Sequence, residues 1–207
     1  MVSLSSFIGM ALVALGLVLT PGPNMMYLVS RSIIQGRRAG LMSLAGVAVG
    51  FFVYLLAAVV GIATLFTLVP ALYTTIKLAG AAYLAYLAWG ALKPGGRSAF
   101  TPQDLPPDPP LKLFTMGLVT NLLNPKIAIL YISVLPQFVR PGHGPVALQS
   151  LLLGLTQISI AVTVNGLIAI SAGTIADFLG KRPKWLRIQR YAMGGMLAAI
   201  AARVATT

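Results

Sequence analysis

The sequence lacks cysteine and has few charged residues. None of its 207 residues is a cysteine, which excludes a disulfide framework and thiolate chemistry. Charged residues make up 9% of the chain, whereas a soluble domain carries about 25%. Only 3 residues are acidic and 1 is histidine, so the chain is short of the nucleophile–base pairs, metal ligands and paired carboxylates that enzymes use. We therefore expect a protein that is not an enzyme and that has no catalytic residue, metal or cofactor.

In place of charge, the sequence has long apolar runs. Hydrophobic residues make up 57% of the chain, and several uncharged stretches reach the roughly 20 residues that a membrane-spanning helix needs. The expected fold class is an all-α membrane protein with about six transmembrane helices. The sixth is short, since its uncharged part would be about 18 Å long, and a five-span protein with a surface-lying tail is the alternative. The six expected spans lie within residues 5–30, 41–69, 71–92, 113–138, 146–176 and from 185 onward.

Prolines and glycines divide the chain into two halves. They are dense in residues 93–112, which predicts an extended linker. The linker separates a first three-helix repeat, residues 1–92, from a second, residues 113–207. Each repeat opens with a proline-broken span, expected helices 1 and 4. Because each half has an odd number of helices, the second would be inserted upside down, the inverted-repeat plan of many secondary transporters.

The net charge of +12 is explained by membrane topology rather than by nucleic acid. Eleven of the 15 Lys and Arg residues follow expected spans one, three and five, in segments that the positive-inside rule assigns to the cytoplasm. The linker should then be cytoplasmic and both termini should lie outside. The basic residues form no stripe interleaved with aromatic residues, so we expect no nucleic-acid partner.

The first expected span is interrupted by Pro21-Gly22-Pro23-Asn24. Two prolines and a glycine remove backbone donors and permit non-helical angles. In hydrocarbon, each freed backbone group costs several kcal/mol, so such a break is tolerated where it is buried in protein or lines a wet cavity. An ordinary proline kink is the alternative, and this motif alone does not decide between the two.

The second break, Asn124-Pro125-Lys126, lies near the middle of the fourth expected span. Asn favours the N-cap and Pro the first helical position, so a half-helix should begin here with its partial positive charge inside the bilayer. A lysine at mid-membrane costs about 2.5–3.5 kcal/mol, which makes Lys126 a functional-site candidate unless it snorkels to a headgroup. Two half-helix starts and a lysine predict a site for an anion, such as the carboxylate of a small metabolite.

Polar residues beside the breaks complete the candidate site. Gln137, Gln157 and Asn165 are polar residues in or beside expected spans. Each could contact the substrate, and an interhelical hydrogen bond is the alternative. Gly46 and Gly50 are four apart, the spacing that lets membrane helices approach closely. The predicted substrate-binding residues are Pro21, Gly22, Pro23, Asn24, Asn121, Asn124, Pro125, Lys126 and Gln137.

The motifs resemble those of a known family. The segments TPGPN at 20–24, QGRRAGL at 35–41 and GVAVG at 46–50 resemble the first half of the LysE/RhtB family of amino-acid exporters. The segments NLLNPK at 121–126 and LPQF at 135–138 resemble that family's second signature. The resemblance covers essentially the whole chain in length, span number and motif order.

The resemblance implies a multi-pass protein of the bacterial inner membrane, a secondary transporter that exports small amino acids or derivatives such as homoserine lactone, driven by the proton gradient. The implied partners are a small amino-acid-like substrate, protons and the lipid bilayer, with a homo-oligomer left open. Some members of the family carry an acidic residue where this chain has Asn24 or Phe51, and these differences argue against lysine as cargo. An exporter of metal or inorganic ions and a non-transporting accessory protein are the alternatives.

The charge asymmetry yields a topology prediction. Single cysteines placed at both termini and near Pro70 and Gly142 of this cysteine-free chain should react with a membrane-impermeant reagent added outside. Cysteines near Arg37, Lys181 and in the 93–112 linker should react only from the cytoplasm. Labelling of a C-terminal cysteine only from the cytoplasm would contradict six spans and support five.

Overall fold

The computed structural model describes three continuous segments and some separate positions. The segments are residues 2–20, 22–68 and 107–180, and the separate positions fall between 75 and 93 and between 184 and 205. Half of the third expected span, and most of the sixth expected span and of the 93–112 linker, therefore lie outside the described residues. Throughout the described part, the regular structure is helical.

The candidate membrane spans among the described residues are fewer than the six expected. Two of them, α3 and α7, are each long and apolar enough to cross a membrane, and two bent pairs bring the number of candidate spans to at most four in the described part. The elements are α1 (Leu4–Leu19), α2 (Pro23–Gln35), α3 (Arg37–Leu68), α5 (Pro110–Leu122), α6 (Pro125–Ile129), a π-helical turn η1 (Leu130–Val134), a 3₁₀ turn η2 (Leu135–Phe138) and α7 (Val146–Gly180).

Both predicted breaks are present. The axis bends by 53° between α1 and α2, and by 50° between α5 and the stretch from α6 to η2. The second break forms as its residue types dictate: Pro125 takes the first helical position, and the Asn124 side chain accepts a hydrogen bond from the Lys126 N–H at 3.1 Å. The α5 helix begins at Pro110, inside the range assigned to the linker, because proline at the first position removes no intrahelical hydrogen bond.

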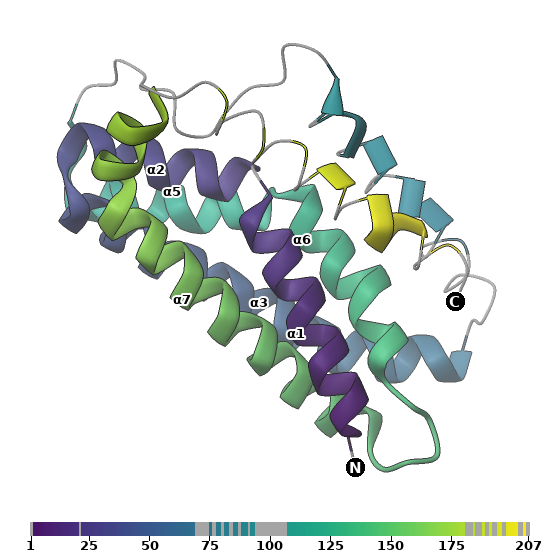
Figure 1. The fold of residues 1–207 in the computed structure, drawn as a ribbon. Coiled ribbons are helices and arrows are strands. Elements are labelled where there is room, and N and C mark those ends of the chain that lie inside the picture. The colour runs from purple at the N-terminus through teal and green to yellow at the C-terminus, as the bar shows by residue number, and fades with distance from the viewer. Residues whose placement is uncertain are drawn as a thin grey trace.

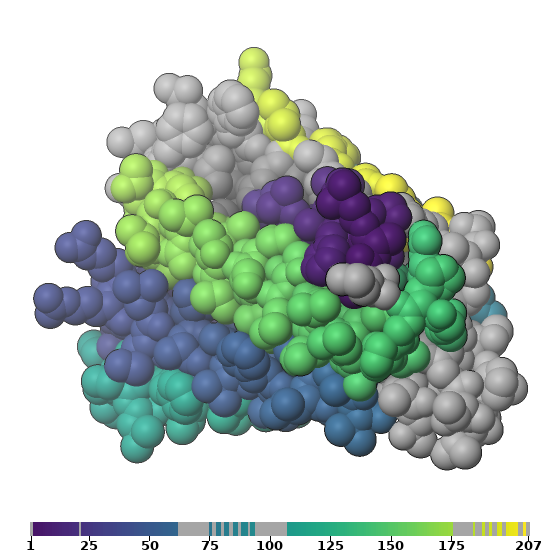
Figure 2. Space-filling view, turned by 90° about the horizontal axis from the view of Figure 1, so that it is seen from below, coloured from purple at the N-terminus to yellow at the C-terminus, as the bar shows by residue number. Residues whose placement is uncertain are grey.

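The central helix of the described bundle is α3. Figure 2 shows it as a blue band between α5 in teal and α7 in green. It runs parallel to α5, since Gly46 and Gly50 face Phe114 and Asn121 in the same order. It runs antiparallel to α7, because Gly154 packs on Leu55 near one end of α3 while Gly40 packs on Ala169 near the other. The N-terminus and the loop between η2 and α7 lie at the same end of the bundle (Figure 1).

Small residues bring α3 and α5 into backbone contact, as the glycine spacing predicted. A Cβ added at Gly46 would collide with the carbonyl oxygen of Phe114, and one added at Gly117 would collide with that of Ser43. A Cβ at Gly50 would lie 2.7 Å from the side-chain oxygen of Asn121. Van der Waals packing of this kind is a main source of helix association in lipid, because the hydrophobic effect does not act between helices there.

An ion cluster joins the end of α2 to the start of α5. Asp108 accepts from Arg31 at 2.6 Å and from Lys112 at 2.7 Å, and its carbonyl accepts from the Gln35 amide at 3.0 Å. The Arg31 and Asp108 side chains are buried, whereas Lys112 is exposed. The hydrogen bond from Lys112 and the positive charge of Arg31 hold the pKa of Asp108 below its usual value, although its burial opposes that shift.

We predict that Gly46→Ala destabilises the protein and that Gly61→Ala on the same helix does not. The new methyl at position 46 would overlap a main-chain oxygen, and overpacking of this kind costs about 1–3 kcal/mol. Among the residues that the structure describes, nothing lies within 4 Å of the Cβ position at Gly61. Melting temperatures of the two detergent-purified variants test this, and equal values would contradict the close α3–α5 contact.

Candidate functional site

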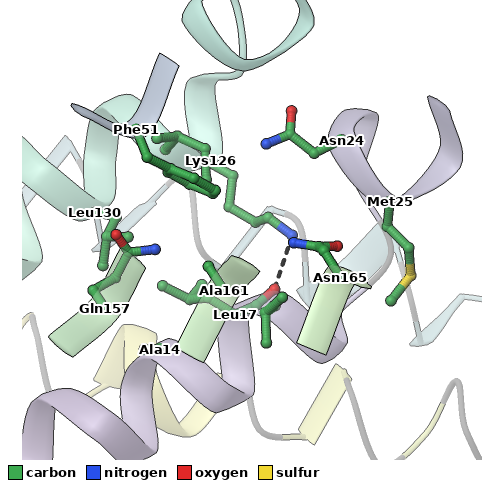
Figure 3. A pocket seen from close by; sticks show the side chains of 12 residues that line it. Ala14, Leu17, Asn24, Met25, Phe51, Lys126, Leu130, Gln157, Ala161 and Asn165 are labelled. Carbon is green, nitrogen blue, oxygen red and sulfur yellow. Dashed lines mark hydrogen bonds between the residues drawn. The ribbon is translucent and has the colours of Figure 1, made fainter. Parts of the chain in front are cut away.

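The lysine of the second break reaches into the first. Its ammonium nitrogen donates to the carbonyl oxygens of Leu17 and Thr20, each at 2.9 Å, and Figure 3 shows the bond to Leu17. Lys126 is 5% exposed. It therefore does not snorkel to a headgroup, and the alternative raised from the sequence is wrong. The two breaks, more than a hundred residues apart in the chain, meet at this side chain.

The contacts of Lys126 differ from the sequence expectation of a lysine turned toward an anion. The last carbonyls of a helix have no intrahelical partner, and they carry the partial negative charge of the helix dipole. Lys126 donates to two carbonyls at the end of α1, and that of Leu17 also accepts from the Thr20 N–H at 3.3 Å. The Thr20 hydroxyl donates to the Gly16 carbonyl at 2.8 Å. The lysine thus acts as the C-terminal cap of α1.

Gly22 leaves the room that this contact requires. It is the N-cap residue of α2, in an extended conformation that any residue can adopt. A Cβ added there, however, would lie 2.9 Å from the Lys126 ammonium nitrogen and 3.2 Å from its Cε carbon. Any other residue at position 22 would push the lysine away from the α1 carbonyls.

A small cavity lies beside the lysine. Its volume is about 20 Å³, enough for about one water molecule and too small for an amino acid. Four polar side chains line it, from α2, α6 and α7: Asn24, Lys126, Gln157 and Asn165 (Figure 3). The rest of the lining is apolar and includes Leu17, Phe51 and Leu130.

Three asparagines at the breaks hold buried amide atoms that have no partner among the described residues. Both amide atoms of Asn24 and of Asn121 are unpartnered, as is the amide nitrogen of Asn124. Buried polar atoms are nearly always hydrogen-bonded, since leaving one unpaired costs about 1–3 kcal/mol. Asn24 lines the cavity, whereas Asn121 lies in the α3–α5 interface against Gly50. Asn24 thus brings an unpartnered amide to the cavity.

Some predicted site residues lie apart from this cluster. Gln137 does not line the cavity, and its amide donates to the Ser133 carbonyl one turn earlier at 2.8 Å. Pro23 and Pro125 are exposed and start their helices. Pro21 lies outside the described residues.

Sequence reasoning undervalued two residues of α7. Gln157 and Asn165 line the cavity, and Gln157 accepts a hydrogen bond from the Tyr131 hydroxyl at 2.6 Å. Their polarity inside an apolar span was the available signal, but it does not distinguish a cavity from a helix interface. The carbonyls that hold Lys126 could not be named in advance, because every residue has one.

Comparisons with known proteins agree with the motifs. A sequence model of the LysE type translocator family matches residues 15–207. The leucine efflux protein of Salmonella typhimurium (strain LT2) is 27% identical over 197 residues, which cover 93% of this chain and 91% of the relative. The leucine efflux protein of Klebsiella pneumoniae is 26% identical over 193 residues, with the same coverage. No solved structure gives a significant match.

The unpartnered amide of Asn24 yields a stability prediction. Asn24→Leu should leave the melting temperature unchanged or raise it, because the substitution removes buried polar atoms that make no hydrogen bond. Asn124→Leu is the matched control, and it should destabilise by about 1 kcal/mol through loss of the N-cap bond to Lys126. A clear loss of stability in Asn24→Leu would show that its amide supports the fold.

Proposed function

The chain belongs to the LysE type translocator family, and from that premise we propose that it exports small neutral amino acids with aliphatic side chains, leucine among them. It is a membrane transporter, not an enzyme. The observation that carries the cargo proposal is the small cavity at the two helix breaks, where a lysine and an unpartnered amide lie against an apolar lining. The leucine efflux proteins named above support the cargo class.

The break between α1 and α2 matches both charges of an amino acid. The end of α1 presents carbonyl oxygens, and the start of α2 presents the N–H groups of Asn24 and Met25, which have no intrahelical partner in a first turn. Helix N-termini attract carboxylates, and helix C-termini attract ammonium groups. In the proposed site the Asn24 amide donates to the carboxylate, while Leu17, Phe51 and Leu130 contact an aliphatic side chain.

The lining disfavours a basic cargo. No acidic residue lines the cavity in the described part of the chain. A lysine or arginine substrate would bury a second positive charge beside Lys126 without a partner, which is costly in a low-dielectric site. A neutral aliphatic side chain meets no such penalty.

The cavity is too small for cargo, so transport requires the bundle to open. We place the opening at the two breaks, where helix ends can change angle without loss of regular hydrogen bonds. The antiparallel arrangement of α3 and α7 supports inverted repeats at 1–92 and 113–207. The distribution of Lys and Arg supports the location of both termini outside the cytoplasm. In this scheme the two repeats rock about the site, and an inward proton gradient drives export.

Transport by purified protein tests the proposal. Proteoliposomes loaded with a panel of amino acids should release leucine and similar aliphatic amino acids when the external medium is made more acidic than the lumen, and should retain lysine. Asn24→Leu should slow leucine release about tenfold or more, since a hydrogen bond to a charged group is worth about 1.5–3 kcal/mol.

Two results would contradict the proposal. Folded protein that releases no amino acid of the panel would favour an accessory role. Release of metal or inorganic ions in place of amino acids would favour the ion-exporter alternative.

A further inference from the structure

The ammonium group of Lys126 is bound as the amino group of a ligand would be bound. It lies buried between the carbonyl oxygens of Leu17 and Thr20, at 2.9 Å from each. A primary ammonium has three donors, and those two carbonyls take two of them. The α-ammonium of a free amino acid carries the same charge and the same three donors. The end of α1 is therefore built to hold an ammonium group, whichever molecule supplies it.

We propose that the Leu17 and Thr20 carbonyls are the subsite for the amino group of the cargo, and that Lys126 occupies this subsite when no cargo is bound. The inference rests on the proposed function, since it requires a cargo with an amino group. It adds that the lysine and the cargo compete for one pair of oxygens.

The surroundings of the subsite fit this exchange. With Lys126 in place, the neighbouring cavity holds about one water molecule. Withdrawal of the lysine from the carbonyls would free the space that its side chain fills. The Asn24 amide, buried and unpartnered, lines the same cavity and would bind the carboxylate. Gly22 borders the lysine head, and the absence of a side chain there leaves room for an ammonium group at the carbonyls.

Competition for one subsite couples cargo to a proton. Two ammonium groups cannot share one pair of carbonyls in a buried site, because like charges repel strongly there. When a zwitterionic amino acid binds from the cytoplasm, Lys126 changes from –NH₃⁺ to –NH₂ and its proton enters the cytoplasm. After the cargo leaves on the outer side, Lys126 takes a proton from that side and returns to the carbonyls. One proton moves inward for each amino acid that moves outward.

No other titratable side chain lines the cavity in the part of the chain that the structure describes. The elements packed around the lysine present Asn24 from α2, Phe51 from α3, Leu130 from η1, and Gln157 and Asn165 from α7. The phenol of Tyr131 lies behind this lining and donates to Gln157, and it stacks on the ring of Tyr54. Arg31, Asp108 and Lys112 form their cluster at the far end of α2.

Proton release by the unmodified protein is the first test. Leucine added to weakly buffered, detergent-purified protein with a pH indicator should release about one proton per leucine bound. The keto acid of the same skeleton, 4-methyl-2-oxopentanoate, has no amino group and should release none. The apparent affinity for leucine should rise about tenfold per pH unit while the lysine is protonated, because one proton leaves on binding. Leucine binding without proton release, or with no pH dependence, would overturn the inference.

Two variants at position 126 separate binding from coupling. In proteoliposomes, Lys126→Gln should still exchange internal for external leucine, with an affinity that is at least as high as wild type and independent of pH. It should no longer accumulate or release leucine against its gradient under a pH difference. Lys126→Arg keeps a charge that cannot be removed and should block both exchange and gradient-driven transport.

The results distinguish the two proposals. If the wild-type protein exchanges leucine and Lys126→Gln still transports leucine under a pH difference, this inference is wrong. The proposed function would stand. Folded Lys126→Gln that binds no leucine would also overturn this inference, because the lysine would then contribute to binding. Wild-type protein that exchanges no amino acid would overturn the proposed function and this inference with it.

Discussion

A helix that breaks inside a bilayer leaves carbonyl oxygens short of donors, and in this protein one buried lysine donates to two of them. The break at residues 21–24 ends α1 amid apolar surroundings, where each unsatisfied group costs several kcal/mol. Lys126 supplies the missing donors from the second broken span, so each break stabilises the other. Gly22 is needed for the lysine to approach, and the Asn124 cap starts the short helix that carries it.

The frame around this contact is packed more closely than the site itself. Glycines on α3 and α5 let the two backbones touch, and α7 packs along the other side of α3. At the breaks, by contrast, a small cavity remains and the amide of Asn24 lacks partners. Natural proteins leave such local defects where function requires them and compensate with stability elsewhere. Closely packed helices around a centre whose polar atoms are not all hydrogen-bonded suit a site that must exchange one bound group for another.

The lengths of the uncharged apolar runs and the residue types at the two breaks were sufficient to predict much of the local structure. Uncharged runs of membrane length became α3 and α7, because apolar composition over 20 or more residues leaves few other structures in lipid. Pro23 and Pro125 start helices, since proline fits the first turn and no later one. Gly46 and Gly50 lie in a helix contact, as their spacing indicated. The π-helical turn at 130–134 had no comparable local signal.

The sequence by itself determined that the chain has broken helices and that a lysine lies at one break, because proline geometry and helix capping depend on neighbouring residues. Only the tertiary structure decided which groups meet. Lys126 and Leu17 are 109 positions apart in the chain, and their contact depends on how two spans pack. Packing likewise turned Gln157 and Asn165 toward the cavity while Gln137 bonded within its own turn. Polarity shows that a side chain needs a partner, but the packing of the helices decides which partner lies within reach.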